Sequence, residues 1–339
     1  FQASRPPLYH ELLNLPESDT GLERELGGNV AGNIRAGRAV RSGFGSSGVS
    51  SFNRIIERHS IDDGAYWKSY DFDGNAGKKN IFNHPLGPDN SLNSFEHAGG
   101  EIIYNLPNGL QAYLLVNEKG TRVDKAPVEI VSDPKQNDRT VQNGISCMSC
   151  HVEGIREPKR LAEVRDSVKA NINSFENAEY GKILALYGTR EALNAEFETD
   201  RKRFTAALRE CGISTTDTEP ISILTSIFEE ELNLETAAAE IGVTPGAFMQ
   251  TMVATPVLAR VVGPLRLKGG RISREVFERE FSLLQGAISK KVFSARKDAY
   301  NQATFCLGQK DSPAAIGHLT EALNLDPDFL LARWHRAFA

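Results

Sequence analysis

The sequence predicts an α+β fold that is mostly helical, and two observations carry this prediction. Residues 99–131 hold two runs of strand-forming side chains around a hairpin signal, which indicates a small antiparallel β-meander in a loop-rich front half. From residue 161 onward, apolar residues recur at the 3.6-residue spacing of amphipathic helices. We expect three domains: residues 1–160 with the meander, a helical domain over residues 161–292, and a helical hairpin over residues 293–339.

Composition and charge narrow the class of protein. The 339 residues are 40% hydrophobic and 24% charged, as in ordinary globular proteins. The formal net charge is −5 and Lys and Arg form no blocks, so we expect no nucleic-acid partner. No apolar run approaches the roughly 18 residues that span a bilayer, so we expect no transmembrane segment.

The first hundred residues give few strand signals. We expect a short helix after Pro6-Pro7 and a second, loosely packed helix over residues 21–41. Residues 43–48 match the glycine pattern of a dinucleotide-binding loop, but the basic residues 35–42 before them do not resemble a buried strand, which favours a plain loop. Aromatic side chains are densest over residues 51–97, where we expect a core built largely from loops and aromatics.

The meander is the clearest strand signal. Glu101–Leu106 and Leu110–Val116 flank the turn Pro107-Asn108-Gly109, and a second turn at residues 118–120 leads into Thr121–Val123. A polar segment over residues 133–144 follows.

Helices are expected throughout the C-terminal half. The predicted segments are Leu161–Leu186, Arg190–Cys211, Ile221–Leu232, Glu235–Gly242, a helix that begins at Thr244-Pro245, and Ser273–Lys290.

The last forty residues fit one tetratricopeptide (TPR) unit over Ala299–Pro327, followed by the opening helix of a second unit over Phe329–Ala339. The matching positions are Ala303, Ala315, Leu319, Ala322 and Pro327. One repeat cannot bury its own apolar face, so we expect a longer array or a protein partner docked through these helices. A plain helical hairpin with the same spacing is the alternative.

The motif with the greatest chemical specificity is Cys147-Met148-Ser149-Cys150-His151. This Cys-x-x-Cys-His spacing is the attachment signature of a c-type haem. Thiols at i and i+3 lie on one side of a helical turn and can form thioethers with the two vinyl groups of one porphyrin edge. His151 then gives its imidazole to the iron as the proximal ligand. The sequence therefore predicts one covalently attached haem c.

Two other uses of these thiols are less favoured. A structural zinc site needs two more soft ligands at short spacing, and the remaining cysteines, Cys211 and Cys306, are isolated and distant. A thioredoxin-like Cys-x-x-Cys should follow a strand in a βαβ unit, whereas a polar, turn-rich segment precedes Cys147. In an oxidising compartment Cys211 and Cys306 could pair, and the sequence leaves this open.

From residue 4 to about residue 280 the chain resembles a family of secreted bacterial proteins with a single c-type haem domain and no established reaction. The longest shared runs are Arg5–His10, Tyr66–Phe72, His84–Pro88, Phe95–Ile103, Leu106–Tyr113, Ile130–Pro134 and Cys147–His151. The resemblance implies haem attachment and secretion. Because haem c is normally attached outside the cytoplasm, we expect a periplasmic or extracellular protein whose leader was removed before Phe1, or whose chain was trimmed.

The sixth iron ligand is the open question. His97, just before Gly99-Gly100 and close to the meander, is the favoured distal ligand, and His84, followed by Pro85, is the second candidate. The remaining candidates are His59, His10, His318, His335, Met249 and Met252, and we expect the two methionines to fill a helix core instead.

We consider three functions, the first two of which differ in what occupies the sixth iron position. A bis-histidine haem makes an electron carrier that exchanges electrons with a redox partner protein. An open position makes a peroxidase or oxygenase acting on a small-molecule oxidant, with His97 or His59 as acid/base and Arg54 or Arg58 stabilising negative charge. A structural or surface-assembly protein, with haem as a cross-link, is the third. We rank them in this order.

Overall fold

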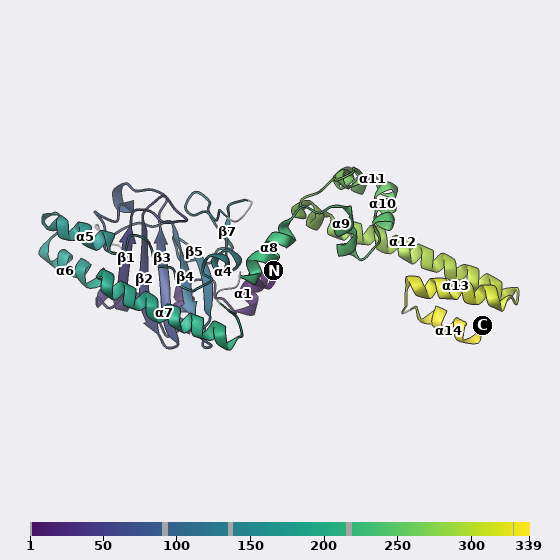
Figure 1. Ribbon diagram of the computed structural model, residues 1–339, viewed down its shortest axis with the longest axis horizontal. Helices are drawn as coiled ribbons and strands as arrows, with labels where there is room; N and C mark the ends of the chain where they lie inside the picture. Colours follow the sequence, from purple (N-terminus) through teal and green to yellow (C-terminus); the bar gives the residue numbers. More distant parts are fainter. Residues whose placement is uncertain (1, 90–93, 135–137, 215–218, 328) are drawn as a thin grey trace. The chain divides into compact units, whose positions relative to one another are not determined.

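The computed structural model confirms a mostly helical α+β fold (Figure 1). It describes residues 2–89, 94–134, 138–214, 219–327 and 329–339. The chain forms two compact units, Phe1–Thr225 and Ser226–Ala339. Their boundary falls within helix α8 (Pro220–Glu229) and therefore inside the segment 161–292 for which the sequence predicted a separate helical domain.

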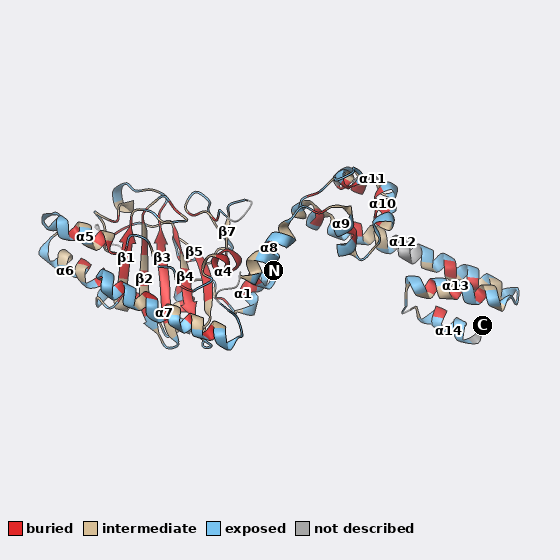
Figure 2. Cartoon of the chain, in the orientation of Figure 1, coloured by how far each residue is buried: buried red, intermediate tan, exposed pale blue. Residues whose placement is uncertain are grey.

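The first unit is built on a five-stranded antiparallel sheet with strand order β1-β2-β3-β4-β5. The strands are β1 (Val40–Phe44), β2 (Arg54–Ile61), β3 (Gly64–Asp71), β4 (Gly99–Asn105) and β5 (Gln111–Asn117). The predicted hairpin corresponds to β4 and β5. A two-stranded ribbon of β6 (Lys125–Ala126) and β7 (Val141–Gln142) follows. Figure 2 shows that most strand residues of the sheet are buried.

The expectation of a loop-built core over residues 51–97 is wrong, because β2 and β3 lie there. The alternation of apolar and polar residues that marks a strand is interrupted here, because polar side chains occupy positions that face the core. Glu57 and His59 on β2 and Lys68 on β3 are all buried, and all point to one face of the sheet. A pattern of apolar and polar residues cannot reveal a strand whose inward positions are charged.

Short helices precede the sheet: η1 (Gln2–Ser4), α1 (Leu8–Leu12), α2 (Asp19–Glu25) and α3 (Val30–Arg35). The predicted single helix over residues 21–41 is wrong: two shorter helices end at Arg35, and strand β1 begins at Val40. Asp19 of α2 accepts a hydrogen bond from Lys68, and Asn33 of α3 contacts His59 at 3.3 Å. These contacts place α2 and α3 against the face of the sheet that carries Glu57.

Helix α7 (Arg190–Glu210) crosses the opposite face (Figure 1). Its buried Asp200 accepts a hydrogen bond of 2.7 Å from the indole N–H of Trp67 and two hydrogen bonds from Arg58. Phe197, one turn earlier, stacks on Trp67 with 4.8 Å between ring centroids. One aspartate therefore joins α7 to both β2 and β3.

Two helices pack near β1 and replace the single helix predicted over Leu161–Leu186. They are α5 (Glu163–Ala170) and α6 (Asn177–Leu186), separated by η3 (Ile172–Ser174). Asn171 ends α5, and its side-chain amide donates to the Ser167 carbonyl at 2.9 Å. Asparagine and serine side chains compete in this way for backbone hydrogen bonds, which explains the break.

Among its described residues the second unit contains helices and an isolated antiparallel bridge between Leu232 and Ile272, but no strand beyond it. After α8 come α9 (Leu234–Ile241), α10 (Pro245–Ala254), α11 (Pro256–Val261), η4 (Gly263–Arg266), α12 (Arg274–Gly308), α13 (Ser312–Leu325) and α14 (Leu330–Phe338). Thr244 caps α10 through its side chain, with Pro245 at the first helical position, as predicted. The core of α9–α12 includes Phe248 and Met252, both fully buried.

Helix α12 runs without interruption through residues 291–298, between the predicted Ser273–Lys290 helix and the TPR-like segment. These residues contain neither proline nor glycine, so nothing ends the helix there. Helices α12 and α13 form a hairpin in which Ala303, Ala315, Leu319 and Ala322 are fully buried. Whether this hairpin is a TPR unit stays a prediction.

Within the part of the chain that the structure describes, no helix is both long and apolar enough to cross a bilayer.

We predict that Asp200→Ala lowers the free energy of unfolding of the first unit by about 3 kcal/mol, because it leaves Arg58 and the Trp67 indole without their buried acceptor. Urea denaturation in a Trp334→Phe background checks this, since Trp67 is then the only tryptophan. The control is Glu198→Ala, an exposed residue of the same helix, which should cost under about 0.5 kcal/mol. Equal effects of the two substitutions would contradict the assigned role of Asp200.

Candidate functional site

The Cys-x-x-Cys-His motif occupies a short helix, α4 (Ile145–Cys150), with His151 as its C-cap. The backbone N–H of His151 donates to the Cys147 carbonyl at 2.8 Å. Gly144 precedes the helix with φ of +84°, and a Cβ there would lie 2.5 Å from the Ser4 carbonyl oxygen and 2.9 Å from the Tyr9 ring. Glycine is therefore required where the N-terminal segment packs against the start of α4.

The imidazole of His151 is oriented by the backbone that follows it. Its Nδ1 lies 3.1 Å from the Gly154 carbonyl oxygen, and because a carbonyl only accepts, Nδ1 carries the proton. The Gly154 N–H donates back to the His151 carbonyl at 2.9 Å, and Gly154 adopts φ of +91°. This tight turn fixes the ring so that Nε2 faces Glu101. Metal-binding histidines are commonly oriented through their other ring nitrogen in this way.

Glu101 on β4 is the group that faces Nε2. Its Oε2 lies 3.7 Å from His151 Nε2, and both side chains are largely buried. Burial opposes ionisation of Glu101, but His151 in its doubly protonated form, through its charge and its hydrogen bond, followed by the charge of Arg54, outweighs burial and lowers the pKa of Glu101 to about 2. An ionised carboxylate therefore lies next to the motif.

The two cysteines differ in environment. Cys147 is 2% exposed and Cys150 is half-buried. Burial, together with the adjacent Glu101 carboxylate, raises the pKa of the Cys147 thiol. A reactive redox thiol requires a lowered pKa, so this environment does not favour the thioredoxin-like alternative.

A row of polar side chains connects the motif to the sheet. Arg54 on β2 contacts Asp71 on β3 at 2.7 Å and Glu101 on β4 at 3.6 Å. Ser69 lies between them: its Oγ accepts from the backbone N–H of Glu101 at 2.8 Å and from Arg54 at 3.1 Å. The row thus extends across three strands and ends at His151. Glu101 was read from the sequence only as the start of a strand, and no local signal marked its role.

The structure does not bring His97 together with His151. The His97 ring contacts Tyr70 edge-on, with 5.1 Å between ring centroids. Tyr70 shares a face of the sheet with Lys68, whose cross-strand partner is Ile102, so Tyr70 and the adjacent Glu101 side chain point to opposite faces. His97 and His151 therefore lie on opposite sides of the sheet.

His84 lies at the other end of the sheet. The carbonyl of the next residue, Pro85, accepts hydrogen bonds from Arg41 on β1 and from Tyr187. His151 lies beside β4 and β5, and three strand spacings correspond to about 14 Å. His84 therefore lies near β1 and His151 beside β4 and β5, so the two histidines do not meet.

His59 and His10 are engaged elsewhere. His59 is fully buried between Glu57 and Asn33 on the face away from His151. His10 Nε2 accepts from the Asn143 amide at 2.8 Å, just before the motif. Arg58 is held by Asp200, so of the two predicted arginines only Arg54 reaches the motif, through Glu101.

The other candidates belong to the second unit. They are His318, His335, Met249 and Met252, and Met252 fills the helical core as expected. Cys211 lies at the end of α7 and Cys306 on α12, and both are free cysteines. Over the described ranges, no three His, Cys, Asp or Glu side chains assemble into a metal-binding cluster.

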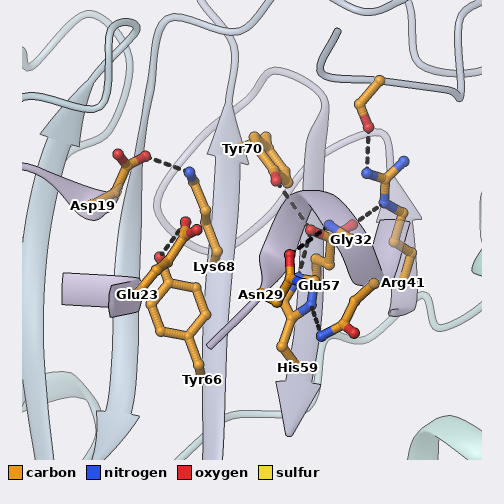
Figure 3. A network of polar contacts seen from close by, with 12 residues as sticks. Asp19, Glu23, Asn29, Gly32, Arg41, Glu57, His59, Tyr66, Lys68 and Tyr70 are labelled. Carbon is orange, nitrogen blue, oxygen red and sulfur yellow. Dashed lines mark hydrogen bonds and ion pairs between the residues drawn. The ribbon is translucent and has the colours of Figure 1, made fainter. Parts of the chain in front are cut away.

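Figure 3 shows a second polar cluster, on the face of the sheet away from the motif. Its centre is Glu57, which is fully buried and accepts hydrogen bonds from Arg41, His59 and Tyr70. Burial raises the pKa of Glu57, but the Arg41 charge and the His59 hydrogen bond outweigh this and lower it to about 2. Both carboxylate oxygens of Glu57 accept hydrogen bonds from residues within the cluster, which indicates a structural role.

No protein-family model, curated protein or solved structure matches the chain.

We predict that His97 makes the first unit less stable in acid. Burial, followed by the charge of Lys68, lowers the pKa of His97 from 6.5 to about 4, so between these values the unfolded chain binds the proton more tightly. The free energy of unfolding should therefore fall by up to about 3 kcal/mol as pH drops from 7 to 4. His97→Gln should remove this part of the pH dependence in urea titrations. Identical pH profiles of the two proteins would contradict the assignment.

Proposed function

We propose that the protein is a secreted or periplasmic monohaem c-type cytochrome that acts in electron transfer. Cys147 and Cys150 hold the haem covalently, and His151 is the proximal iron ligand. Each thiol adds across one vinyl group, with sulfur bonding to one carbon and hydrogen going to the other, so attachment needs no oxidant. The bound haem supplies a one-electron iron couple for exchange with a redox partner protein.

One observation carries this proposal: the orientation of His151. Its Nδ1 is tied to the Gly154 carbonyl, which leaves Nε2 as the coordinating atom directly after a helical turn that bears both thiols. A solvent-exposed histidine after an ordinary Cys-x-x-Cys pair has no reason to be fixed in this tautomer. The donor set of two thiols and one oriented imidazole fits a haem c.

The surroundings of the motif suit a buried redox group. Tyr113 packs beside His151 with 6.0 Å between ring centroids, and Tyr9, which accepts a hydrogen bond from the Tyr113 backbone at 2.9 Å, packs beside Gly144 at the start of α4. Both rings are buried, as is Cys147. In this proposal a protein partner docks on the TPR-like hairpin α12–α13 and helix α14.

A second candidate is a haem enzyme that acts on a small-molecule oxidant. The observation that favours it is the Arg54–Glu101 pair beside His151, because a guanidinium and a carboxylate near an open iron can stabilise charge and move protons.

We predict that the exported protein, produced together with a haem-attachment system, keeps its haem after denaturation and acid extraction. Cys147→Ser/Cys150→Ser should lose the haem completely, because no thioether can form. His151→Ala should lack the normal proximal-ligand spectrum, measured as visible absorbance of the oxidised and reduced protein.

The matched control is Cys211→Ser/Cys306→Ser, which removes two thiols outside the motif and should leave the spectrum unchanged. A wild-type protein without c-type absorbance bands would refute the proposed function and return Cys147 and Cys150 to the zinc or redox alternatives.

A further inference from the structure

We infer that the protein forms a reciprocal homodimer in which helix α8 of each copy packs on helix α14 of the other. Each of these helices carries an exposed apolar stripe, the two stripes have the same spacing, and the charges beside them are opposite. Such a dimer gives α14 a protein partner and does not depend on haem attachment.

Helix α8 turns three aliphatic side chains toward solvent. Ile223, Leu224 and Ile227 are between 45% and 61% exposed, and their i, i+1, i+4 spacing places them on one face of the helix. The other side of α8 is anchored to the start of α12. There the Arg274 guanidinium lies 4.0 Å from the centroid of the Phe228 ring and donates to the Phe228 carbonyl at 2.7 Å. The apolar stripe of α8 therefore faces away from the protein's own core.

The sequence of α8 makes burial of this stripe favourable. The helix has ten residues, of which three are isoleucine, a weaker helix former than leucine or alanine. Helices this short are marginal in water unless a face is packed. Glu219 caps the first turn, where its carboxylate accepts from the backbone N–H groups of Ile221 and Ser222 at 2.8 and 2.6 Å. A second helix on the exposed stripe would supply the packing that the cap does not.

Helix α14 carries a stripe with the same spacing. Leu330, Leu331 and Trp334 are between 55% and 75% exposed. Together with Arg333 they line a shallow hollow in the surface. Ala332, on the other side of the helix, is fully buried against the α12–α13 hairpin. The apolar stripe of α14 is therefore also turned outward.

Charge determines which stripe pairs with which. Helix α14 contains Arg333 and Arg336 and no acidic residue, whereas α8 contains no basic residue and is followed by the exposed Glu230 and Glu231. Two α14 helices, or two α8 helices, would bring like charges together beside the apolar contact, which disfavours both pairings. Pairing α8 with α14 brings glutamates to arginines instead.

The size of the contact favours two such pairings in each dimer. Helices of ten and nine residues are each only about 14–15 Å long. One pair therefore covers much less than the roughly 1,600 Å² of a standard protein interface. Reciprocal pairing doubles the buried area and closes the assembly with two-fold symmetry, as in most homodimers.

The test measures the mass of the full chain by light scattering during size-exclusion chromatography, at concentrations of roughly 1 to 100 μM. We expect the wild-type chain to be a dimer. Ile227→Glu and Leu330→Glu each place a charge in one stripe and should raise the dimer Kd at least about tenfold. The control is Val253→Glu, an equally exposed apolar residue of α10, which should leave the dimer unchanged. Far-UV circular dichroism checks that each variant is folded.

Two further measurements test the pairing itself. In an equimolar mixture, the Ile227→Glu chain has an intact α14 stripe and the Leu330→Glu chain an intact α8 stripe, so the mixture should associate more tightly than either variant alone. Glu230→Lys/Glu231→Lys should raise the dimer Kd at least about tenfold at low salt and by less at high salt, because the lost attraction is electrostatic.

Three results would overturn the inference. The first is a wild-type chain that stays monomeric over the whole concentration range. The second is a dimer that persists in Ile227→Glu, which would assign the interface to α14 paired with itself or to another surface. The third is a monomer that binds anionic lipid vesicles and loses this binding in Leu330→Glu, which would assign the α14 stripe to a membrane surface. All three are distinct from failure of the proposed function, in which the chain carries no covalent haem.

Discussion

The arrangement of the first unit depends on a carboxylate with no exposure to water. Glu57 joins β1, β2 and β3 by accepting hydrogen bonds from Arg41, His59 and Tyr70, and an unpaired charge at this depth would cost several kcal/mol. Because a register slip of one residue would turn every side chain to the other face, the cluster specifies one register. The same register directs Arg54 to the opposite face, toward Glu101.

The side chains that surround His151 therefore come from strands far from the motif in sequence. Asp71, Arg54 and Glu101 come from three strands and end at His151, while Gly144 and Gly154 fix the start of α4 and the tautomer of the imidazole. If the protein carries the proposed haem, the two thiols on a helical turn supply attachment and the strands supply the side chains around His151.

Sequence reasoning identified the features that local pattern controls. The hairpin of β4 and β5, most helices from α7 onward and the helical position of Cys147 and Cys150 follow from turn residues and spacing. Helix α11 and the continuity of α12 were not predicted. Strand β1 was missed because the basic residues 35–42 did not resemble a buried strand, although Arg41 is fully buried there. Strands β2 and β3 were missed because Glu57, His59 and Lys68 occupy core positions that a pattern search expects to be apolar. The residue that faces His151 was also missed. His97 is close to the meander in sequence, but Glu101 lies on the face of the sheet that holds α4. Strand pairing, which the sequence does not show, determines both the buried charges and the neighbour of His151.

Mass spectrometry of the peptide that contains Cys147–His151 tests the central claim most directly, using exported protein made with a haem-attachment system. The account predicts a peptide whose mass is increased by one haem, with fragmentation assigning thioethers to both Cys147 and Cys150. Two free thiols, or a disulfide between them, would contradict it.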